Sequence, residues 1–444
     1  MKSICVLAPF ALALSIACFG QAELRSVAAS DPVNSSAAVP TLSVDEAVAA
    51  ALESNLDIRA AVRRLSLAQL KTNTARSLDD PMLMTRDWDT PLRRPWDLNQ
   101  AQLMVSLQQT FPSRQKRDQR TRLAQDSAGE AANDLESLRQ EVSVEVRKIC
   151  AELMRNADQL RLLERQRSLL KEALAAALAE YTTGKSPQAG VLRAQMALTR
   201  LSEQLIDLEA ERDDAHAQLN ALMGRPPDQA IEISGSYALP RVLPSIEELE
   251  QSAIEHRPEL AALRAQIAKS RDEGKLTRMA MKPDFTVALG YMLMPTGSPA
   301  RSAYMGEMSM NLPWLNRERH EGEAKQADAA TEVSQAELDA RAATIFLEIR
   351  QAQIELLAAE KRVKLYRDTL LPQAEASFKA TVAEYQNNRG EFMSLIEAQS
   401  LLLEIQTAYY KASAATDEGM AQLERAVGAP VSKPGNSNPE RTIQ

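Results

Sequence analysis

The side chains most able to do chemistry are scattered along this chain of 444 residues. Its histidines, His216, His256 and His320, fit none of the short spacings that hold a metal ion, such as His-Glu-x-x-His. The sequence has no nucleophile elbow and no glycine-rich phosphate loop. The acidic pair Asp79-Asp80 precedes a proline, which indicates a helix end rather than a site. We therefore expect no enzyme, no catalytic residue, no bound metal and no cofactor.

Methionine is the other chemistry-bearing group, because nine methionines gather in and around short segments of alternating apolar residues. They are Met82, Met84, Met279, Met281, Met292, Met294, Met305, Met308 and Met310. Thioether sulfur prefers soft ions such as Cu(I), so one interpretation is a copper or silver relay. The other is an ordinary apolar surface. We favour the second, because Met308 and Met310 share a strand parity with Tyr304 and Leu312 and should face lipid with them.

The N-terminus has the composition of an export signal. An apolar stretch runs from Ile4 to Phe19, and small residues after it predict cleavage behind Ala22, so that residues 1–22 form a signal peptide. The alternative is a lipoprotein signal in which Cys18 carries the lipid. Residues 23–41 are rich in Ser, Ala and Pro and predict a flexible lead.

The charge, the cysteine content and the hydropathy of the chain limit its expected partners, disulfides and membrane-spanning helices. A net charge of −8 argues against a nucleic-acid partner, which needs a concentrated basic surface. After export Cys150 stands alone, so it cannot form an internal disulfide, and its apolar helical surroundings predict a core residue. No later segment offers about 18 consecutive apolar residues, which a membrane-spanning helix would need.

The chain repeats itself with a period near 200 residues. The run Ala51 to Ile58 returns at Ala253 to Leu260, Ala179-Glu180-Tyr181 returns as Ala383-Glu384-Tyr385, and Gly224-Arg225-Pro226 returns as Gly428-Ala429-Pro430. A period this long requires each copy to be a complete arrangement of several elements. We predict repeats over 42–228 and 244–430, with a linker over 229–243 and a disordered tail over 431–444.

Each repeat is expected to begin with one helix. Capping boxes at Ser43 and Ser245 start these helices, which should run to about Leu78 and to Lys282. A helix free of proline is then predicted from Arg114 to Tyr181.

The counterpart of that long helix in the second repeat carries a seam of apolar residues seven apart, including Ile349 and Leu356, which predicts coiled-coil packing. Pro372 should kink it. Both long helices should turn back into returning helices, over about 188–223 and 391–427.

Four segments alternate between apolar and polar residues with the period of a strand, at 82–88, 103–111, 285–291 and 304–312. Their length suits tilted strands that cross a membrane. The polar positions expected to face a lumen are Ser106, Gln108, Thr286, Glu307, Ser309 and Asn311. Because a closed membrane barrel needs about eight strands, these strands must combine with those of other copies.

The doubled order of helix, two strands and long hairpin resembles the TolC-type outer-membrane efflux channel family over about 42–430. The opening Asp45-Glu46-Ala47, the hairpin approaches ending in Tyr181 and Tyr385, and the closing Gly-x-Pro carry the resemblance. The run from Gln108 to Arg117 resembles the cobalt–zinc–cadmium branch, in which a Gly usually stands at the place of Gln115.

The resemblance implies a mainly α fold with a small β part. Three chains would pool four strands each into a 12-stranded barrel in the outer membrane, and their helices would form a periplasmic α-barrel. The implied partners are two further copies, outer-membrane lipid, a periplasmic adaptor and an inner-membrane pump of the RND type. The protein would be a passive exit channel, with heavy-metal cations as one cargo.

The hairpin ends are where the family would place a closable mouth and the adaptor contact. The candidate gate residues are Glu397, Arg389, Glu391 and Arg193, with three copies of Glu397 forming a ring that attracts cations. The candidate adaptor contacts are Gly184, Lys185, Arg389 and Gly390. Two other functions stay open: an exit channel for type I protein secretion, and a soluble periplasmic coiled-coil interaction or adaptor protein.

Overall fold

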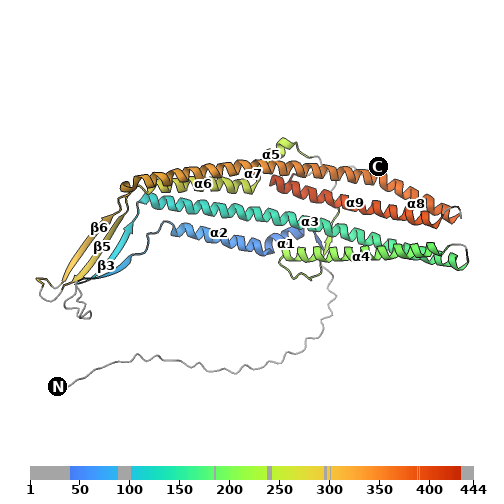
Figure 1. Cartoon of the computed structure of the whole chain (residues 1–444), viewed down its shortest axis with the longest axis horizontal. Coiled ribbons are helices and arrows are strands. Elements are labelled where there is room, and N and C mark those ends of the chain that lie inside the picture. The colour runs from blue at the N-terminus through green and yellow to red at the C-terminus, as the bar shows by residue number, and fades with distance from the viewer. Residues whose placement is uncertain are drawn as a thin grey trace, which may run out of the picture. The chain divides into compact units, whose positions relative to one another are not determined.

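The computed structural model describes residues 41–88, 102–184, 187–237, 243–294, 298–300, 302–387, 389 and 391–431, which belong to one compact unit (Figure 1). The predicted signal peptide, Cys18, almost all of the flexible lead and the tail from residue 432 on lie outside the described residues.

The helix expected at the start of the first repeat is in fact two helices, α1 (Val44–Ser54) and α2 (Leu56–Thr74). The capping box at Ser43 is present, as the sequence predicted. Asn55 separates the two helices, because its Oδ1 accepts hydrogen bonds from the backbone N–H groups of Asp57 and Ile58 and so caps α2. The prediction of one continuous helix to about Leu78 was therefore wrong.

The second repeat shows the same break for a different reason. Its helices are α5 (Ile246–His256) and α6 (Pro258–Met279), and Ser245 again forms a capping box. Arg257 lies between them with an extended backbone (ψ 117°). A residue that precedes proline is sterically pushed out of the helical region, so Pro258 ends α5 and begins α6. The single helix expected to reach Lys282 was wrong here too.

All four predicted strands are present and form one antiparallel sheet. They are β2 (Met82–Trp88), β3 (Gln102–Phe111), β5 (Phe285–Leu293) and β6 (Ser302–Met310), in the order β2-β3-β5-β6. The central pair joins the repeats, since Phe111 of β3 lies opposite Phe285 of β5. The outer strands β2 and β6 each have one neighbour in this sheet.

A second sheet was not expected from the sequence. It pairs β1 (Thr41–Ser43) in parallel with β4 (Glu232–Ser234), within the segment predicted to be a linker. Three residues are too few to show a strand period, so alternation carried no signal for it.

Long helices follow each strand pair. In the first repeat they are α3 (Arg114–Thr182) and the returning α4 (Gln188–Leu222). In the second repeat a short 3₁₀ turn (Pro313–Asn316) leads into α7 (Arg317–Leu365), and α8 (Leu371–Gln386) and the returning α9 (Phe392–Val427) follow. Within this unit the strands lie at one end of the helices and the hairpin turns at the other (Figure 1).

The predicted interruption at Pro372 takes the form of a π-helical turn, Tyr366–Leu370, just before α8. Pro372 stands in the first turn of α8. A proline lacks the N–H that an α-helix would use and its ring crowds the carbonyl four residues earlier, so a wider turn ahead of it lets the chain continue as a helix.

The helices form a layer in the order α2, α3, α6, α7, which is also the order of the strands that they adjoin (Figure 1). Each repeat has its own apolar core. That of the first repeat includes Val146 and Cys150, and that of the second includes Ile349 and Leu356. Cys150 is thus a buried core residue, as predicted. None of the helices among the described residues is long and apolar enough to cross a membrane.

In both repeats, the end of the returning helix accepts hydrogen bonds from a residue at an equivalent position. In the first, Asn55 Nδ2 donates to Leu222 O at 3.0 Å. In the second, Arg257, which stands 202 residues later, donates to Ala426 O at 2.7 Å and to Arg425 O at 3.0 Å. The Gly-x-Pro motif follows at once, and both of its glycines have positive φ, 64° at Gly224 and 78° at Gly428.

Candidate functional site: the two faces of the sheet and the hairpin ends

The antiparallel register sorts the strand residues onto two faces of the sheet. One face is mostly apolar, with Thr85, Asp87, Gln109 and Ser302 as its polar residues, and its apolar side chains are largely exposed in the single chain. It carries Val105, Leu107, Phe111, Phe285, Val287, Leu289, Tyr291, Leu293, Tyr304, Met308 and Met310. Tyr304 is 90% exposed and Leu289 is 68% exposed. An exposed apolar surface of this extent needs an apolar environment or a partner.

The opposite face carries the polar residues that the sequence assigned to a lumen. The register places Ser106, Gln108, Thr286, Glu307 and Ser309 on this face together. The hydroxyl groups of Thr110 and Thr286 lie 3.1 Å apart across β3 and β5. Asn311 differs from the prediction, because β6 ends at Met310 and Asn311 lies beyond the strand. Its Oδ1 accepts a hydrogen bond from the backbone N–H of Asp284 at 2.6 Å.

The methionines divide between the two faces. Met308 and Met310 lie on the apolar face, as their parity with Tyr304 predicted. Met82 and Met84 lie on the polar face, because they stand opposite Gln108 and Ser106 in the register. The sequence interpretation considered the methionines mainly through the β6 pair and missed this difference.

Lys116 fixes the junction between the sheet and the helices. Its ammonium group lies 2.8 Å from Asp284 Oδ1 and 2.8 Å from Lys282 O, and its side chain is 7% exposed. The contact joins the start of α3 in one repeat to the start of β5 in the other. A buried ammonium group needs such partners, because an unpaired charge there would be costly. The sequence flagged Lys116 only as part of a family motif.

The hairpin ends are described only in part. Gly184 has φ 76°, the left-handed conformation that glycine adopts at a helix end without strain. Lys185 and Gly390 lie outside the described residues. Arg389 is exposed, and its backbone N–H donates to Glu384 O at 2.9 Å.

The four candidate gate residues lie near these turns. Glu391 directly precedes α9, Arg193 is on α4 and Glu397 is on α9, and all three are exposed, as is Arg389. No ion pair within the described part of the chain joins any of these four side chains.

A contact that the sequence analysis did not single out connects the two hairpins. The hydroxyl group of Tyr385 on α8 donates to Glu180 Oε1 on α3 at 2.9 Å. Burial, together with the hydrogen bond to Glu180 and the charge of Glu180, raises the pKa of Tyr385 to about 12. Both residues belong to the repeated Ala-Glu-Tyr motif, so the signal was present. What the sequence did not reveal is that Tyr of one copy meets Glu of the other.

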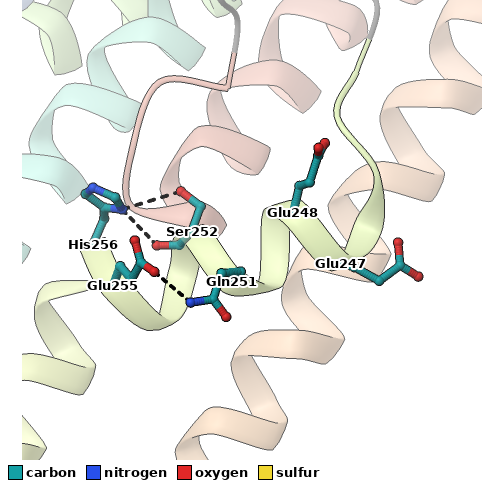
Figure 2. A pocket seen from close by; sticks show the side chains of 6 residues that line it. All are labelled: Glu247, Glu248, Gln251, Ser252, Glu255 and His256. Carbon is teal, nitrogen blue, oxygen red and sulfur yellow. Dashed lines mark hydrogen bonds between the residues drawn. The ribbon is translucent and has the colours of Figure 1, made fainter.

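A shallow hollow on α5 is lined by Glu247, Glu248 and Glu255 together with His256 (Figure 2). The ring Nδ1 of His256 lies 3.0 Å from Ser252 O, and Gln251 donates to Glu255 at 2.6 Å. These contacts stay within one helix. Among the described residues, no group of three or more His, Cys, Asp or Glu side chains has the arrangement of a metal site.

Comparisons with known proteins agree with this architecture. The family model for outer membrane efflux proteins matches the chain twice, over residues 47–225 and 249–429. The "Cobalt-zinc-cadmium resistance protein CzcC" of Cupriavidus metallidurans is 23% identical over 399 residues, which cover 89% of this chain and 92% of CzcC.

Solved structures share the fold. The outer-membrane channel OprN superposes with a TM-score of 0.73 at 16% identity, over 87% of this chain and 90% of OprN. VceC of Vibrio cholerae gives a TM-score of 0.72 at 18% identity, over 88% of this chain and 97% of VceC. The resemblance drawn from the sequence is therefore confirmed, as is a mostly helical fold with a few strands.

Proposed function

Because this chain belongs to the outer membrane efflux protein family, we propose that it is the passive outer-membrane exit channel of a three-part efflux system, and that it works as a homotrimer. The family places the chain in the outer membrane. In the proposed system an inner-membrane pump supplies the energy, and a periplasmic adaptor brings that pump to the hairpin ends. The channel itself needs no catalytic group.

One observation carries this proposal: a four-stranded sheet with one mostly apolar face, one polar face and two outer strands that each pair on one side only. In hydrocarbon every backbone N–H and C=O must be paired, so β2 and β6 need strands from other copies. Closing the ring turns the apolar face to lipid and the polar face to the interior. Three copies give 12 strands, within the size range of closed outer-membrane barrels.

The contact between the two repeats offers a template for the joint between copies. Inside one chain α3 packs on α6, and Lys269 Nζ lies 3.0 Å from Glu130 Oε2 across that contact. The outer helices of the layer are α2 and α7, which are the repeat counterparts of α6 and α3. In a ring, α7 of one copy should therefore meet α2 of the next as α3 meets α6.

Buried core residues fix the offsets of this correspondence. Ile58 of α2 matches Leu260 of α6 at an offset of 202, and Val142 of α3 matches Ile345 of α7 at an offset of 203; all four are buried. The offsets then translate any residue of the inner contact into its counterpart in the proposed outer one.

The pair Lys269–Glu130 translates into Leu67 of α2 and Val333 of α7. These are apolar residues that are 55% and 57% exposed in the single chain. Gln266 and Asp134, which border a common hollow between α3 and α6, translate into Arg64 and Glu337. Both of the translated residues are exposed. The proposed joint thus has an apolar pair beside a pair of opposite charges.

A charge exchange tests this joint. Arg64→Glu and Glu337→Arg should each reduce the fraction of trimer on native gels in detergent, because each places like charges opposite one another. The double variant should restore it. Arg59→Glu, an exposed reversal on another face of α2, is the matched control and should leave the trimer intact. Equal effects of the single and double variants would contradict the joint.

The gate is proposed to lie at the hairpin ends, where Tyr385 and Glu180 join the two hairpins of one chain. The same correspondence between the repeats matches Tyr181 of one copy with Glu384 of its neighbour. Hydrogen bonds of both kinds would then alternate around the ring. Glu397, Arg389, Glu391 and Arg193 remain candidates for further contacts between copies and for cation attraction at the mouth.

Heavy-metal cations are the proposed cargo. The supporting observation is the relative of Cupriavidus metallidurans, whose name assigns it to cobalt, zinc and cadmium resistance. Deleting the gene should lower the tolerance of cells to these metals, and the full-length chain should restore it. Restoration of drug tolerance or protein secretion instead, without metal tolerance, would contradict this cargo.

The function is tested directly by conductance. The purified chain, recovered from the outer membrane with detergent and run as a trimer, should form small, mostly closed channels in a planar bilayer. Tyr385→Phe removes the hydroxyl group that joins the hairpins and should raise the conductance. Tyr366→Phe, in the π-helical turn, is the control. A product that needs no detergent, or one that never conducts in either variant, would contradict the channel and favour a soluble coiled-coil protein.

A further inference from the structure

The charged residues of the main sheet stand only on its two outer strands. Among the described strand residues, β2 has Arg86 and Asp87 and β6 has Glu307, while β3 and β5 have none. Arg86 and Glu307 are exposed on the polar face, whereas Asp87 lies on the apolar face. The polar face therefore has one positive charge at one edge and one negative charge at the other.

These two charges cannot pair within one chain. Three strand spacings, about 14 Å, separate β2 from β6. The charges also stand at different levels, because Arg86 is level with Ala303 across the sheet, four residues before Glu307. No ion pair among the residues that the structure describes includes either side chain. A partner for each of them would have to come from outside the chain.

The contact between β3 and β5 offers a template for a joint between β6 of one copy and β2 of the next. β3 and β6 are the second strands of their repeats, and the prolines after them, Pro112 and Pro313, stand 201 residues apart. β2 and β5 are the first strands, and the prolines before them, Pro81 and Pro283, stand 202 residues apart. These offsets translate each pair of the inner contact into a pair of the outer joint.

The translation brings the two charges together. In the inner contact Gln108 is level with Ala288. The offsets turn this pair into Ser309 of one copy and Arg86 of the next. Glu307 stands two residues before Ser309, on the same face of β6. It is then the diagonal neighbour of Arg86, with Cβ atoms about 7–8 Å apart, a distance that the long side chains of arginine and glutamate span together.

The strand tilt gives an independent check of this register. A row of level residues that starts at Arg86 crosses the four strands and, through the translated joint, enters the next copy six residues beyond its own Arg86. Three copies then give a stagger of about 18 residues around about 12 strands. At about 3.3 Å per residue and about 4.8 Å per strand spacing, the strands tilt by about 45°, as in closed outer-membrane barrels.

We propose that Arg86 of one copy and Glu307 of the next form an ion pair on the interior face of the barrel, and that three such pairs join the ring. This pairing rests on the proposed function and specifies which edges meet and in which register. Joining two β2 edges would place two Arg86 side chains on one face, and joining two β6 edges would place two Glu307 side chains there. Like charges oppose such two-fold joints, so the opposite charges favour a head-to-tail ring.

Disulfide formation tests the register. In a Cys150→Ala background, Thr85→Cys with Met310→Cys puts one cysteine on each edge, at positions that the translated joint makes level on the apolar face. A disulfide needs Cβ atoms about 4 Å apart, so these two cannot react within one chain. Oxidation of the full-length, detergent-solubilised protein should therefore give covalent dimers and trimers on denaturing gels. Thr85→Cys with Leu289→Cys, on a central strand, is the control and should give none.

A charge exchange tests the ion pair itself. Arg86→Glu and Glu307→Arg each place like charges at every joint of the ring, so we expect about a tenfold loss of trimer relative to monomer on native gels. The double variant should restore the trimer. Asp87→Arg reverses a charge on the same strand, but its neighbours across the translated joint, Met308 among them, are uncharged. This control should leave the trimer intact.

Circular dichroism shows whether each variant folds. If a reversed variant did not, Arg86→Gln and Glu307→Gln would replace the reversals, and the double variant should then lose no more trimer than either single variant. Equal losses in the single and double reversals, or losses that add in the neutral set, would overturn the ion pair.

The pairing and the proposed function can fail separately. A protein that runs as a trimer and conducts, but forms no disulfide between Thr85→Cys and Met310→Cys, would overturn the pairing and leave the channel standing. A protein that never forms a trimer, in the parent or in any variant, would contradict both.

Discussion

Replacing Arg257 by Ala should destabilise the second repeat strongly. The guanidinium group, with its side chain 2% exposed, lies 2.7 Å from Glu348 Oε2 and 3.2 Å from Glu259 Oε1. It also donates to the backbone carbonyl groups of residues 425 and 426, at the end of α9. Arg341 contacts both carboxylates as well, so it would keep part of their charge compensated after the substitution.

The magnitude follows from what would be left unpaired. Removing one partner of a buried ion pair costs about 3–5 kcal/mol. Because Arg341 remains and Glu259 and Glu348 are 25% and 35% exposed, we expect the lower limit of that range. A loss of about 3 kcal/mol lowers the equilibrium constant for folding about a hundredfold. Arg257→Lys keeps the charge but not the planar fork, so its effect should be intermediate.

The matched comparison is Asn55→Ala, because Asn55 has the equivalent place in the first repeat. It caps α2 and donates to Leu222 O, without any ion pair. Loss of a helix cap costs about 1 kcal/mol and an unsatisfied carbonyl adds a similar amount. Urea unfolding of the detergent-solubilised protein, followed by circular dichroism, should give a lower free energy of unfolding for Arg257→Ala than for Asn55→Ala. The opposite ranking would refute the reasoning.

Three further predictions concern single sites. Gly224→Ala should destabilise the fold by more than Gly184→Ala. Both glycines have positive φ, but only at Gly224 would an added Cβ meet backbone, 2.7 Å from Ser54 O. Thermal unfolding measures the difference, and equal decreases in melting temperature would contradict the prediction. Burial raises the pKa of Glu418, so its ionisation opposes folding as pH rises. Glu418→Gln should therefore raise the melting temperature at pH 7 and have no such effect below about pH 4, where the carboxyl group is protonated in both states. An unchanged melting temperature at pH 7 would contradict this prediction. Burial also raises the pKa of Cys150 to about 12, so maleimide should label it only after unfolding, and rapid labelling of the native protein would contradict its core position.

The sequence predicted the strands better than the helix breaks. Alternation over seven to ten residues located all four strands of the main sheet. The breaks at Asn55 and Arg257 each depend on one residue, and the apolar period of the helices continues across them. Helical packing on α3 and α7 sets that period, so pattern alone favours one continuous helix. The turn chemistry of Asn55 and the proline after Arg257 were the overlooked signals.

The candidate site shows a similar limit. Parity was enough to place Ser106, Gln108, Thr286, Glu307 and Ser309 on one face. Parity within one strand says nothing of which residues stand opposite each other on the next strand, because the register depends on pairing between distant segments. For that reason the pairs Met84–Ser106 and Met104–Met292 could not be read from the sequence. The contact between Tyr385 and Glu180 could not be read either, because it depends on how two distant helices pack.

The repeats also differ in a way that bears on assembly. The contact between α3 and α6 includes the pair Lys269–Glu130, while its proposed counterpart between chains has Leu67 and Val333. Two repeats of one chain are held near each other by the covalent chain, so their contact can use a partly exposed ion pair that contributes little energy. Separate chains lose translational and rotational freedom when they associate. In the proposed joint, apolar burial at about 25 cal/mol per Å² offsets that loss, so the joint gives a physical reason for leucine and valine at the outer positions of a pattern that is otherwise repeated.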